Sequence, residues 1–541
     1  MRFNDQVPSA PSWSSVLRYA APGILLATIL LVPFFGKAYT IDDPFFLREA
    51  EHTWHDPLHP TAFEIVWNQE VPQRASTLLP GGPLVPFLLL PVVLGGGVEW
   101  IGHLIQQLLF WVGICATVAL ALRCGLSKRE AMLAALLVVA TPAVLGMAGT
   151  VMPDIPAMTF STLAVERLIA WKQQGSWHQG LMATLWMTAA PLTRSHLILL
   201  TGPALLLLVD LPAIRERRPW IGSFLRASAP VWIVPPLVAL VLLITRDPDS
   251  SGGNVITAVQ THRSGLFAFN HNVLTFFGHW VLAIPLALPW AILRGRNLPW
   301  RTLWILIPTA IVVLMTRRWW MAFVVTLSML VLTDILLLAW REKNQTKLFL
   351  GAYLFMALPI AFYVHLPSKY LIASAPGAAI LVVGLFSAAP RQRVAAVFAA
   401  ALCVGTLVGV LVVRTDARMA GSMRDAAAQL IAPRIAAGQH VWYVGQWGFR
   451  WYAEQAGARP LTYTPPFPRT GDIIVFSRAG GAGAIKIIAK RRLLQVVSDT
   501  TPGGRIMDLK SGAGFFSTYW GYLPWSWGSN ETNHFEVWQV E

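Results

Sequence analysis

Apolar runs long enough to cross a lipid bilayer alternate with short polar or basic segments along the first three quarters of the chain. A helix needs about 20 apolar residues to cross a hydrocarbon core of roughly 30 Å. When the runs are separated at their polar punctuation, the pattern predicts about thirteen membrane-spanning helices. They lie near residues 19–36, 99–121, 131–149, 155–172, 179–193, 196–212, 228–245, 273–293, 302–316, 319–340, 348–365, 370–388 and 394–413.

The basic residues between these runs sort to one side of the membrane. That side carries Arg123, Lys128, Arg129, Lys172, Arg215, Arg217, Arg218, Arg294, Arg296, Arg301, Arg341, Lys343, Lys347, Arg391 and Arg393. Because cytoplasmic loops are enriched in Lys and Arg, the pattern predicts a multi-pass protein of the inner (plasma) membrane. Its N-terminus is predicted to be cytoplasmic and its C-terminus periplasmic or otherwise extracytoplasmic. Arg317 and Arg318 break the rule, since they fall on the outer side.

Two segments near the N-terminus need separate interpretation. The tripeptide Gly36–Ala38 has the small-residue character of a signal-peptidase site. The preceding apolar run is long for a signal peptide, so an uncleaved first span is favoured, followed by a first outer loop at 37–82. Residues 83–97 are apolar but are interrupted by prolines and end in glycines. They predict a short span or, as charge parity favours, a re-entrant or interfacial segment.

The pattern changes from Arg414 onward, where charged residues return and apolar runs shorten to strand length. Strands are predicted at 440–445, 472–477 and 535–540, and a helix with a glycine cap at 448–457. The chain is therefore predicted to be an α-helical polytopic membrane domain, residues 1–413, followed by a small extracytoplasmic α/β domain, residues 414–541. Aromatic residues crowd the segment 519–527, where they either pack on sugar rings of an acceptor or simply fill a small core.

Composition supports the membrane assignment. Hydrophobic residues make up 55% of the 541 residues and charged residues only 13%, against about 25% charged in soluble proteins. The net charge of +15 is explained by membrane topology, and no basic stretch interleaved with aromatics predicts nucleic-acid binding. Cys115, Cys124 and Cys403 lie in or beside apolar runs without metal-ligand spacing, and we interpret them as packing residues.

Three acidic residues stand at the predicted outer boundary of the membrane. Asp42 and Asp43 follow the first span, and Asp154 begins the fourth. Asp43 precedes Pro44 and is predicted to cap an interfacial helix whose Phe and Leu side chains face lipid. The alternatives are a solvated helix cap for Asp42 and Asp43 and an ordinary N-cap for Asp154. Their common depth favours a shared catalytic pocket.

Cationic residues gather at the same predicted depth. Arg194 occupies an outer turn, and Lys369 and Tyr370 begin the twelfth span. Together with Arg317 and Arg318 they predict a cationic ring that binds a lipid phosphate. The alternative is ordinary snorkelling of long cationic side chains to the headgroups.

These motifs resemble those of the GT-C glycosyltransferases, and most closely the bacterial aminoarabinose transferase and protein O-mannosyltransferase group. The resemblance extends over the whole membrane part of the chain. It is carried by TIDDPFFLREAEHTWHDPLHPTAFEIVW from Thr40, by Met152–Asp154, and by Lys369–Ile372 with Pro376. Members of this family take a sugar from a polyprenyl-phosphate carrier at the outer face of the membrane, and many have thirteen spans.

The resemblance implies roles for individual residues. Asp42 would be the catalytic carboxylate, Asp43 the second acidic position of that motif, and Asp154 a second acid of the cavity. Lys369 and Arg194 would lie near the carrier phosphate. One departure affects the first loop: relatives often carry a polar residue before Pro-Pro-Leu, whereas residues 78–84 here read LLPGGPL.

The expected function is transfer of a hexose or pentose, with inversion, from a polyprenyl-phosphate donor to a lipid, glycan or protein acceptor. No cofactor is implied by the sequence. A metal-dependent oligosaccharyltransferase is an alternative, with Asp42, Asp154 and a histidine such as His59 as ligands, but nothing in the spacing requires a metal. His59 is otherwise a candidate substrate contact. The alternative from another class is a transporter or flippase of a lipid-linked glycan.

Overall fold

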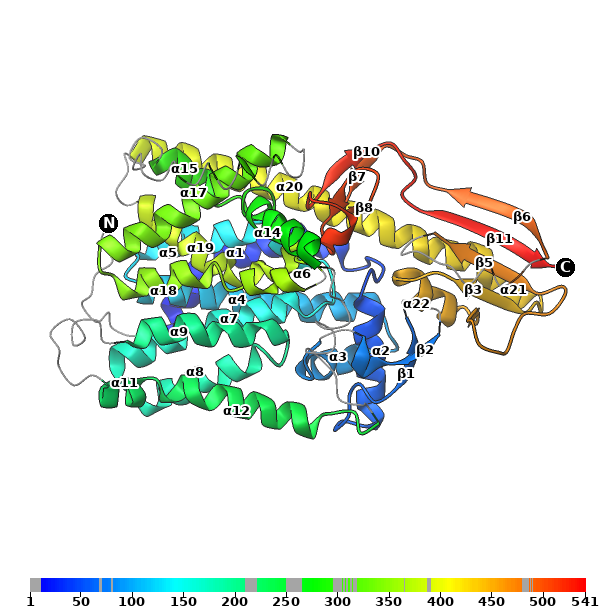
Figure 1. The fold of residues 1–541 in the computed structure, drawn as a ribbon, viewed down its shortest axis with the longest axis horizontal. Helices are drawn as coiled ribbons and strands as arrows, with labels where there is room; N and C mark the ends of the chain where they lie inside the picture. Colours follow the sequence, from blue (N-terminus) through cyan, green and yellow to red (C-terminus); the bar gives the residue numbers. More distant parts are fainter. Residues whose placement is uncertain are drawn as a thin grey trace.

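The computed structural model describes residues 11–67, 71–78, 81–209, 221–249, 265–294, 319–363, 365–386, 391–478 and 490–541, together with positions 304, 307, 310, 311, 314, 486 and 488. The molecule is elongated, with a body of roughly parallel helices at one end and a β-sheet at the other (Figure 1). The N-terminal end of the described chain lies at the far end of the helical body from the C-terminus.

Six helices of the described chain are long and apolar enough to cross a membrane, or nine if each of three bent pairs counts as one span. The six are Trp13–Phe34, Glu99–Arg123, Trp320–Arg341, Gln345–Phe362, Ser368–Leu385 and Val394–Ala436. This confirms a helical membrane protein, while the count of thirteen stays a prediction. The predicted span at 302–316 lies almost wholly outside the described residues.

Two predicted spans are broken helices, and a third helix pair bends at the start of the span predicted at 228–245. α5 (Lys128–Val139) meets α6 (Pro142–Ala148) at 65°, α14 (Gly265–Leu282) meets α15 (Ala287–Arg294) at 71°, and α11 (Ile221–Ala227) meets α12 (Ala229–Ile244) at 52°. Proline lacks an N–H group and clashes with the preceding turn, so Pro142 and Pro285 account for the first two bends. The hydropathy pattern alone does not reveal such a break, because the residues on both sides of it are apolar.

The helices between these elements are α4 (Glu99–Arg123), α7 (Asp154–Gln174), α8 (Trp177–Ala189), η3 (Ser195–Leu200) with α9 (Thr201–Leu208), α17 (Trp319–Arg341), α18 (Gln345–Tyr353) with η6 (Leu358–Phe362), and η7 (Ser368–Tyr370) and η8 (Ile372–Ser374) with α19 (Ala375–Phe386). α1 (Trp13–Leu31) packs on α4 and α5, and α7 packs on α4 and α8.

The first outer loop contains α2 (Asp43–His55) and a hairpin of β1 (Glu64–Val66) and β2 (Pro72–Arg74), and α3 (Leu84–Leu94) follows it. With 11 residues, α3 is about 16 Å long and too short to span a bilayer. The prediction that α2 turns its Phe and Leu side chains toward lipid is wrong. Phe45, Phe46 and Leu47 are fully buried in protein, because α3 and the C-terminal helix α22 cover them.

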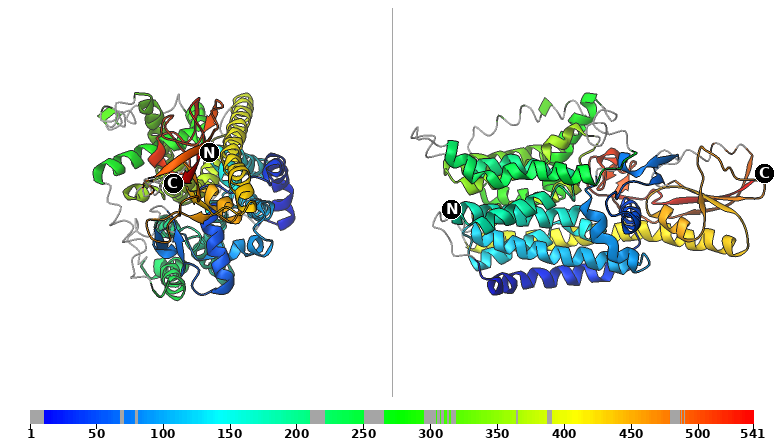
Figure 2. Two further views of the ribbon diagram at one scale, coloured as in Figure 1. Left: turned by 90° about the vertical axis from the view of Figure 1, so that its right-hand side faces the viewer. Right: turned by 90° about the horizontal axis from the view of Figure 1, so that it is seen from below.

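The longest helix joins the two ends of the molecule. α20 (Arg391–Ala426) leaves the helical body and continues beneath the sheet without a break (Figure 2). The predicted domain boundary at 413/414 therefore falls inside a helix. Hydropathy detects the point where polar residues return, whereas the helix continues because its C-terminal part packs on α22 and β7.

The C-terminal region contains the predicted strands. A five-stranded sheet has the order β4-β3-β5-β11-β6, in which β3 pairs in parallel with β4 and β5, and β11 pairs antiparallel with β5 and β6. β3 (Val441–Val444), β5 (Ile473–Ser477), β11 (His534–Val540) and helix α22 (Gly448–Gln455) match the predicted elements. β4 (Arg459–Pro460) and β6 (Arg491–Ser498) complete the sheet.

Short hairpins fill the junction between sheet and helical body. β7 (Gly503–Arg505) pairs with β10 (Ser526–Gly528), and β8 (Met507–Asp508) pairs with β9 (Ala513–Gly514), followed by η11 (Thr518–Trp520). One buried apolar cluster runs from Val16 in α1 to Val537 in β11. The sheet and the helices therefore share a core.

Candidate active site

Four segments far apart in sequence meet where the helical body faces the C-terminal region. Asp42 comes from the loop before α2, Asp154 from the first turn of α7, Arg194 from the residue before η3, and Lys369 and Tyr370 from η7. Lys172 lies at the opposite end of the body, where it donates hydrogen bonds to the Leu207 carbonyl and to Gln345. The separation agrees with the predicted assignment of these residues to opposite sides of a membrane.

The first ion pair joins Asp42 to Lys369. The Lys369 Nζ lies 3.1 Å from the Asp42 Oδ2, and the side chains are 3% and 18% exposed respectively. Asp42 is therefore the accessible member of the pair. It follows Ile41, whose φ of +44° is a strained backbone conformation for a β-branched residue. Such strain persists only where the surroundings hold the backbone firmly.

The surroundings of the Asp42 loop supply that restraint. Lys37 Nζ lies 2.8 Å from Asp416 Oδ2 of α20, with both side chains buried, and the Thr40 hydroxyl donates to Asp416 Oδ1 at 3.2 Å. Asp43 accepts hydrogen bonds from the backbone N–H groups of Thr40 (2.9 Å) and Val151 (3.0 Å). The loop is thus fixed to α20 on one side and to the segment before α7 on the other.

The prediction that Asp43 caps a helix is wrong. Its carboxylate instead joins two backbone segments inside the protein. α2 begins at Asp43 itself, and its carboxylate is fully buried on the two N–H groups. Burial raises the pKa of Asp43 to about 7, against the lowering effects of the Lys37 charge and the two backbone donors. The two adjacent acids are therefore divided in environment: Asp42 faces the site and Asp43 faces the protein interior.

The second ion pair joins Asp154 to Arg194 in bidentate geometry. Arg194 Nε and Nη2 donate to the two carboxylate oxygens at 3.1 and 2.7 Å, and both side chains are buried. No described residue accepts a hydrogen bond from Arg194 Nη1. The backbone around Arg194 is held by the glycines of the first loop, because Gly82 donates to the Thr193 carbonyl and a Cβ on Gly82 would lie 2.0 Å from the Leu192 oxygen.

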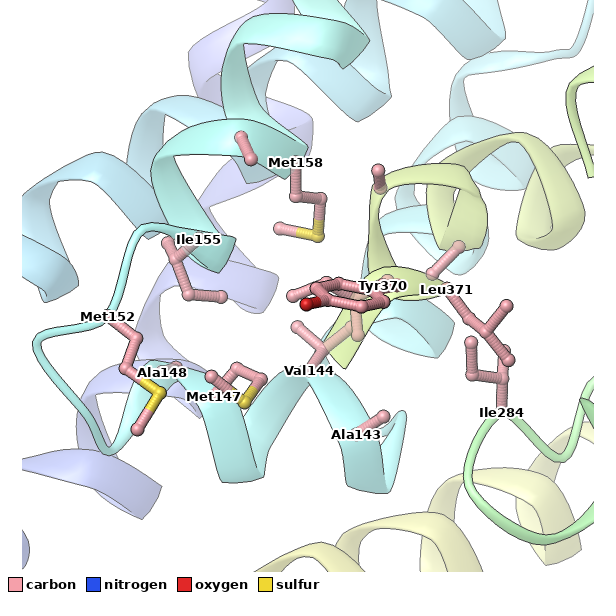
Figure 3. Close-up of a cluster of buried hydrophobic side chains, with 14 of the residues drawn as sticks. Ala143, Val144, Met147, Ala148, Met152, Ile155, Met158, Ile284, Tyr370 and Leu371 are labelled. Atoms are coloured by element: carbon pink, nitrogen blue, oxygen red, sulfur yellow. The ribbon is translucent and has the colours of Figure 1, made fainter. Parts of the chain in front are cut away.

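Tyr370 lies between the cations. Its ring is 5.4 Å from the Arg194 Cζ, 5.9 Å from the Lys369 Nζ and 5.1 Å from the His196 ring. One side of the ring packs in a cluster of buried apolar side chains that includes Val144, Met147, Ile155 and Met158 (Figure 3). This packing fixes the ring, which in turn limits where the cations can lie.

An apolar groove leads away from the cations. Its volume is about 500 Å³, and Arg194, Ser195, His196, Tyr363 and Tyr370 are its polar and aromatic lining residues. The rest of its lining is almost entirely aliphatic: Pro191, Ile198, Leu199, Pro235, Val238, Ala239, Leu242, Pro359, Ile360 and Phe362. Four of these residues come from α12, namely Pro235, Val238, Ala239 and Leu242. They recur at helical spacing, so a single face of that helix forms one wall of the groove.

The structure brings together five of the nine sequence-predicted site residues, namely Asp42, Asp154, Arg194, Lys369 and Tyr370. Asp43 is adjacent but faces inward. His59 lies beyond the other end of α2, where its Nδ1 is 3.0 Å from the Asp56 carboxylate. Arg317 and Arg318 lie outside the described residues. Among the residues that the structure describes, no group of three or more His, Cys, Asp or Glu side chains could hold a metal ion.

Sequence reasoning missed several residues of the site. Lys37 and Asp416 form the buried pair that fixes the Asp42 loop, and His196 and Tyr363 line the groove. A signal existed for the pair, since a lysine directly after the first predicted span and an aspartate three residues after the last have opposite charges at a similar depth. No comparable pattern marked the groove, because its aliphatic residues look like any lipid-facing helix.

Part of the chain matches a known protein family. Residues 81–237 match the model of a family described as dolichyl-phosphate-mannose-protein mannosyltransferase, a region that includes Asp154 and Arg194. No curated protein sequence is significantly similar to the chain.

Solved structures extend the similarity over most of the chain. ArnT from Cupriavidus metallidurans bound to undecaprenyl phosphate matches with a TM-score of 0.50 and 14% identity, over 86% of this chain and 94% of ArnT. Its apo form matches at 0.50 and 13%, over 86% and 93%. The oligosaccharyltransferase AglB from Archaeoglobus fulgidus matches at 0.48 and 13%, over 83% and 65%. The chain thus has the GT-C fold that its motifs predicted.

Proposed function

We propose that this protein is an inverting glycosyltransferase that moves a sugar from a polyprenyl-phosphate carrier to an acceptor at the outer face of the membrane. The proposal is carried by the arrangement of the groove and the charged residues. The aliphatic groove reaches Arg194 and Tyr370, and Lys369 and the accessible Asp42 carboxylate lie beside them. A polyprenyl-phosphate sugar has this same sequence of parts, a hydrocarbon chain followed by an anion and a sugar. ArnT, whose fold the chain shares, binds undecaprenyl phosphate.

The groove suits the hydrocarbon part of the carrier. Burial of apolar surface is favourable by about 25 cal/mol per Å² and has no directional requirement. A branched chain therefore gains affinity from contact with Val238, Leu242 and Ile360 without needing a unique register.

The cations suit the phosphate. Arg194 is held by Asp154 through Nε and Nη2 and keeps Nη1 for an additional acceptor. Lys369 has a flexible stem and a compact ammonium group, so it can exchange the Asp42 carboxylate for a phosphate oxygen. That exchange would leave Asp42 ionised and without its partner at the moment when the donor is bound, which is the state a base requires.

The reaction is then a single displacement. The acceptor oxygen or nitrogen attacks the anomeric carbon, the bond from that carbon to the phosphate oxygen breaks, and the acceptor proton passes to the Asp42 carboxylate. The carrier leaves as polyprenyl phosphate, whose increasing negative charge is stabilised by Arg194 and Lys369. One displacement inverts the anomeric configuration. The resemblance supports the outer-face location, and a hexose or pentose donor with a lipid, glycan or protein acceptor is consistent with it.

The test is a purified-protein assay with radiolabelled polyprenyl-phosphate sugars. We expect one donor to be consumed with release of polyprenyl phosphate in the presence of membrane extract as acceptor, and the product to carry the inverted anomeric configuration. A donor that binds but is never consumed, and that crosses the bilayer of proteoliposomes instead, would contradict the proposal and support a flippase.

A further inference from the structure

A closed loop of the C-terminal region, residues 515–522, lies against the helical body next to η7. Its base is closed by two backbone hydrogen bonds, from the Gly514 N–H to the Leu523 carbonyl at 2.7 Å and from the Leu523 N–H to the Gly512 carbonyl at 3.0 Å. Gly521 is required for this closure, since a Cβ there would lie 2.0 Å from the backbone of Gly512. The loop is therefore a tight and well-defined structure.

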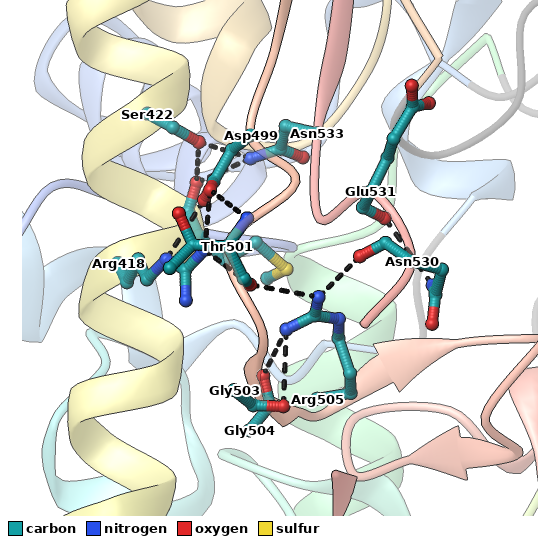
Figure 4. A network of polar contacts seen from close by, with 11 residues as sticks. Arg418, Ser422, Asp499, Thr501, Gly503, Gly504, Arg505, Asn530, Glu531 and Asn533 are labelled. Atoms are coloured by element: carbon teal, nitrogen blue, oxygen red, sulfur yellow. Dashed lines mark hydrogen bonds and ion pairs between the residues drawn. The ribbon is translucent and has the colours of Figure 1, made fainter. Parts of the chain in front are cut away.

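The hairpins that carry the loop are fixed to α20. Arg418 Nε donates to the Asp499 carboxylate at 2.9 Å, and Asn533 Nδ2 donates to the Ser422 hydroxyl (Figure 4). Arg505 donates through both terminal nitrogens to the backbone carbonyls of Thr501, Gly503, Gly504 and Asn530. Because α20 continues into the helical body, these bonds fix the position of the loop relative to that body.

Thr518 of the loop holds the backbone that leads into η7. Its hydroxyl accepts a hydrogen bond from the Leu366 N–H at 3.1 Å and donates to the Asn272 amide oxygen at 3.4 Å. Asn272 Nδ2 in turn donates to the carbonyls of Ala361 and Tyr363. Thr518, Leu366 and Asn272 are fully buried. Loss of the Thr518 hydroxyl would therefore leave a buried N–H group without its acceptor, which is costly.

A second connection passes through His279 of α14. Its Nε2 lies 3.1 Å from the Tyr522 carbonyl, and its Nδ1 lies 2.9 Å from the Ser368 hydroxyl. A carbonyl oxygen can only accept, so Nε2 of the neutral ring carries the proton and Nδ1 accepts from Ser368. Both side chains are fully buried. Through His279 the loop thus fixes the residue directly before Lys369.

A third connection reaches Tyr370. His365 Nδ1 lies 2.9 Å from the Ser517 hydroxyl, and His365 Nε2 lies 3.5 Å from the Tyr370 hydroxyl. The loop is itself fixed along α14, because His271 Nε2 donates to the Thr518 carbonyl at 2.8 Å. The loop therefore holds the segment around η7 at positions 365, 366 and 368, on the chain directly before Lys369 and Tyr370.

The aromatic segment predicted at 519–527 divides between core and surface. The Trp520 ring lies 5.4 Å from the Trp447 ring, and both residues line a cavity of about 310 Å³ beside α20. The Tyr522 ring packs 4.0 Å from the His271 ring. Tyr519 and Trp527, by contrast, are largely exposed. The aromatic residues of the loop itself therefore serve mainly to hold it in place.

We propose that this loop positions Lys369 for the carrier phosphate, so that the C-terminal region takes part in donor binding. The inference rests on the proposed function, which assigns the phosphate to Lys369. A lysine side chain is flexible, and fixing the backbone that carries it limits where its ammonium group can lie. Such preorganisation lowers the cost of binding. Thr518 and Ser368 are then positioning residues, which act through Lys369 and do not touch the donor.

The test titrates undecaprenyl phosphate, the carrier that ArnT binds, into the purified full-length protein and measures the Kd by native mass spectrometry. Thr518→Val removes the hydroxyl and keeps the shape of the side chain. We expect it to raise the Kd by about threefold to tenfold, the effect of losing one neutral hydrogen bond. Lys369→Met should raise the Kd further. If Thr518 acts through Lys369, the double variant should bind no more weakly than Lys369→Met alone.

Three further variants make the result specific. Thr518→Ser keeps the hydroxyl and should retain the wild-type Kd. Ser368→Ala breaks the connection from the side of η7 and should weaken binding as Thr518→Val does, which covers the case in which Thr518→Val does not fold. Thr462→Val is the matched control, because Thr462 is also buried in the C-terminal region but its hydroxyl donates to the nearby Thr464 carbonyl at 2.7 Å.

Four outcomes would overturn the inference. They are a wild-type Kd for both Thr518→Val and Ser368→Ala, an equal loss in Thr462→Val, losses that multiply in the double variant, and a wild-type Kd for Lys369→Met. The last of these would also remove the phosphate site from the proposed function, whereas the first three would leave that site intact. Carrier binding that follows the expected pattern without consumption of any donor would support the positioning role and contradict the transfer reaction.

Discussion

Two cavities in the part of the chain that the structure describes differ in which ligands they can distinguish. The groove beside α12 has a mostly aliphatic lining with a few polar and aromatic residues near Arg194, whereas the cavity beside α20 mixes charged and polar side chains with apolar ones and two tryptophans. An aliphatic wall discriminates weakly between chains that differ by a methylene, but a site with fixed donors and acceptors strongly rejects ligands that leave them unpaired. The groove therefore suits a hydrocarbon chain of variable length, and the cavity suits a more polar ligand.

The largest effect on transfer is expected at Asp42, the proposed base. Asp42→Asn removes the base but keeps the shape of the side chain, so transfer should fall by about 10²-fold to 10⁴-fold. Release of polyprenyl phosphate from labelled donor measures the loss. Donor binding should persist, because the groove and Arg194 are unchanged. Turnover close to wild type in this variant would remove Asp42 from its assigned role.

The next effect concerns the polar end of the groove. Lys369→Met keeps the length of the side chain and loses the charge, and the loss of one charge-assisted hydrogen bond costs about 1.5–3 kcal/mol. Donor kcat/KM should therefore fall by roughly tenfold to a hundredfold. Lys347→Met is the matched control, because Lys347 is also buried and paired with an acid, Glu342, but lies elsewhere in the helical body. Equal kinetics of the two variants would place the phosphate away from Lys369.

The apolar part of the groove can be tested by filling it. Leu242→Trp adds bulk to the wall, so the KM should rise by several fold for a long-chain donor and little for a donor with a very short chain. Leu243→Trp is the control, since this neighbouring residue is 67% exposed and does not line the groove. If both variants treated long and short chains alike, the groove would not be the carrier site.

The last test concerns the buried carboxylate of Asp43, which should affect stability and not transfer. The pKa of Asp43 in the folded protein is about 7, above about 3.9 in an unfolded chain. Between these values the folded state binds more protons, so this group lowers the free energy of unfolding as pH rises from about 4 to 7. Asp43→Asn should flatten that decline in thermal-unfolding scans of the purified protein. Parallel pH profiles for both proteins would show that Asp43 does not titrate in this window.

Much of this architecture follows from the sequence, and the exceptions share a physical cause. Strands β3, β5 and β11 form at the apolar runs that were predicted to be strands, and Asp42, Asp154, Arg194 and Lys369 were predicted to share a depth. The bends at Pro142 and Pro285, by contrast, occur inside continuous apolar runs. Hydropathy treats lipid and protein interior as the same solvent, so it could not show that Phe45 and Phe46 face protein.

The missed parts of the site depend on tertiary approach. Gly82 is required because the backbone of Leu192 passes within contact of it, and no local pattern signals that distance. Paired acids and bases at equal depth can be read from a sequence, whereas cavities cannot.

The continuity of α20 sets a fixed length between the two halves of the protein. Its 36 residues make a rod of about 54 Å, of which a bilayer core takes about 30 Å. The rod has no hinge where it leaves the apolar region, so the C-terminal sheet cannot swing freely as a domain on a flexible linker would. Any group at the sheet end is therefore held at a nearly constant distance from Asp42 along the axis of α20.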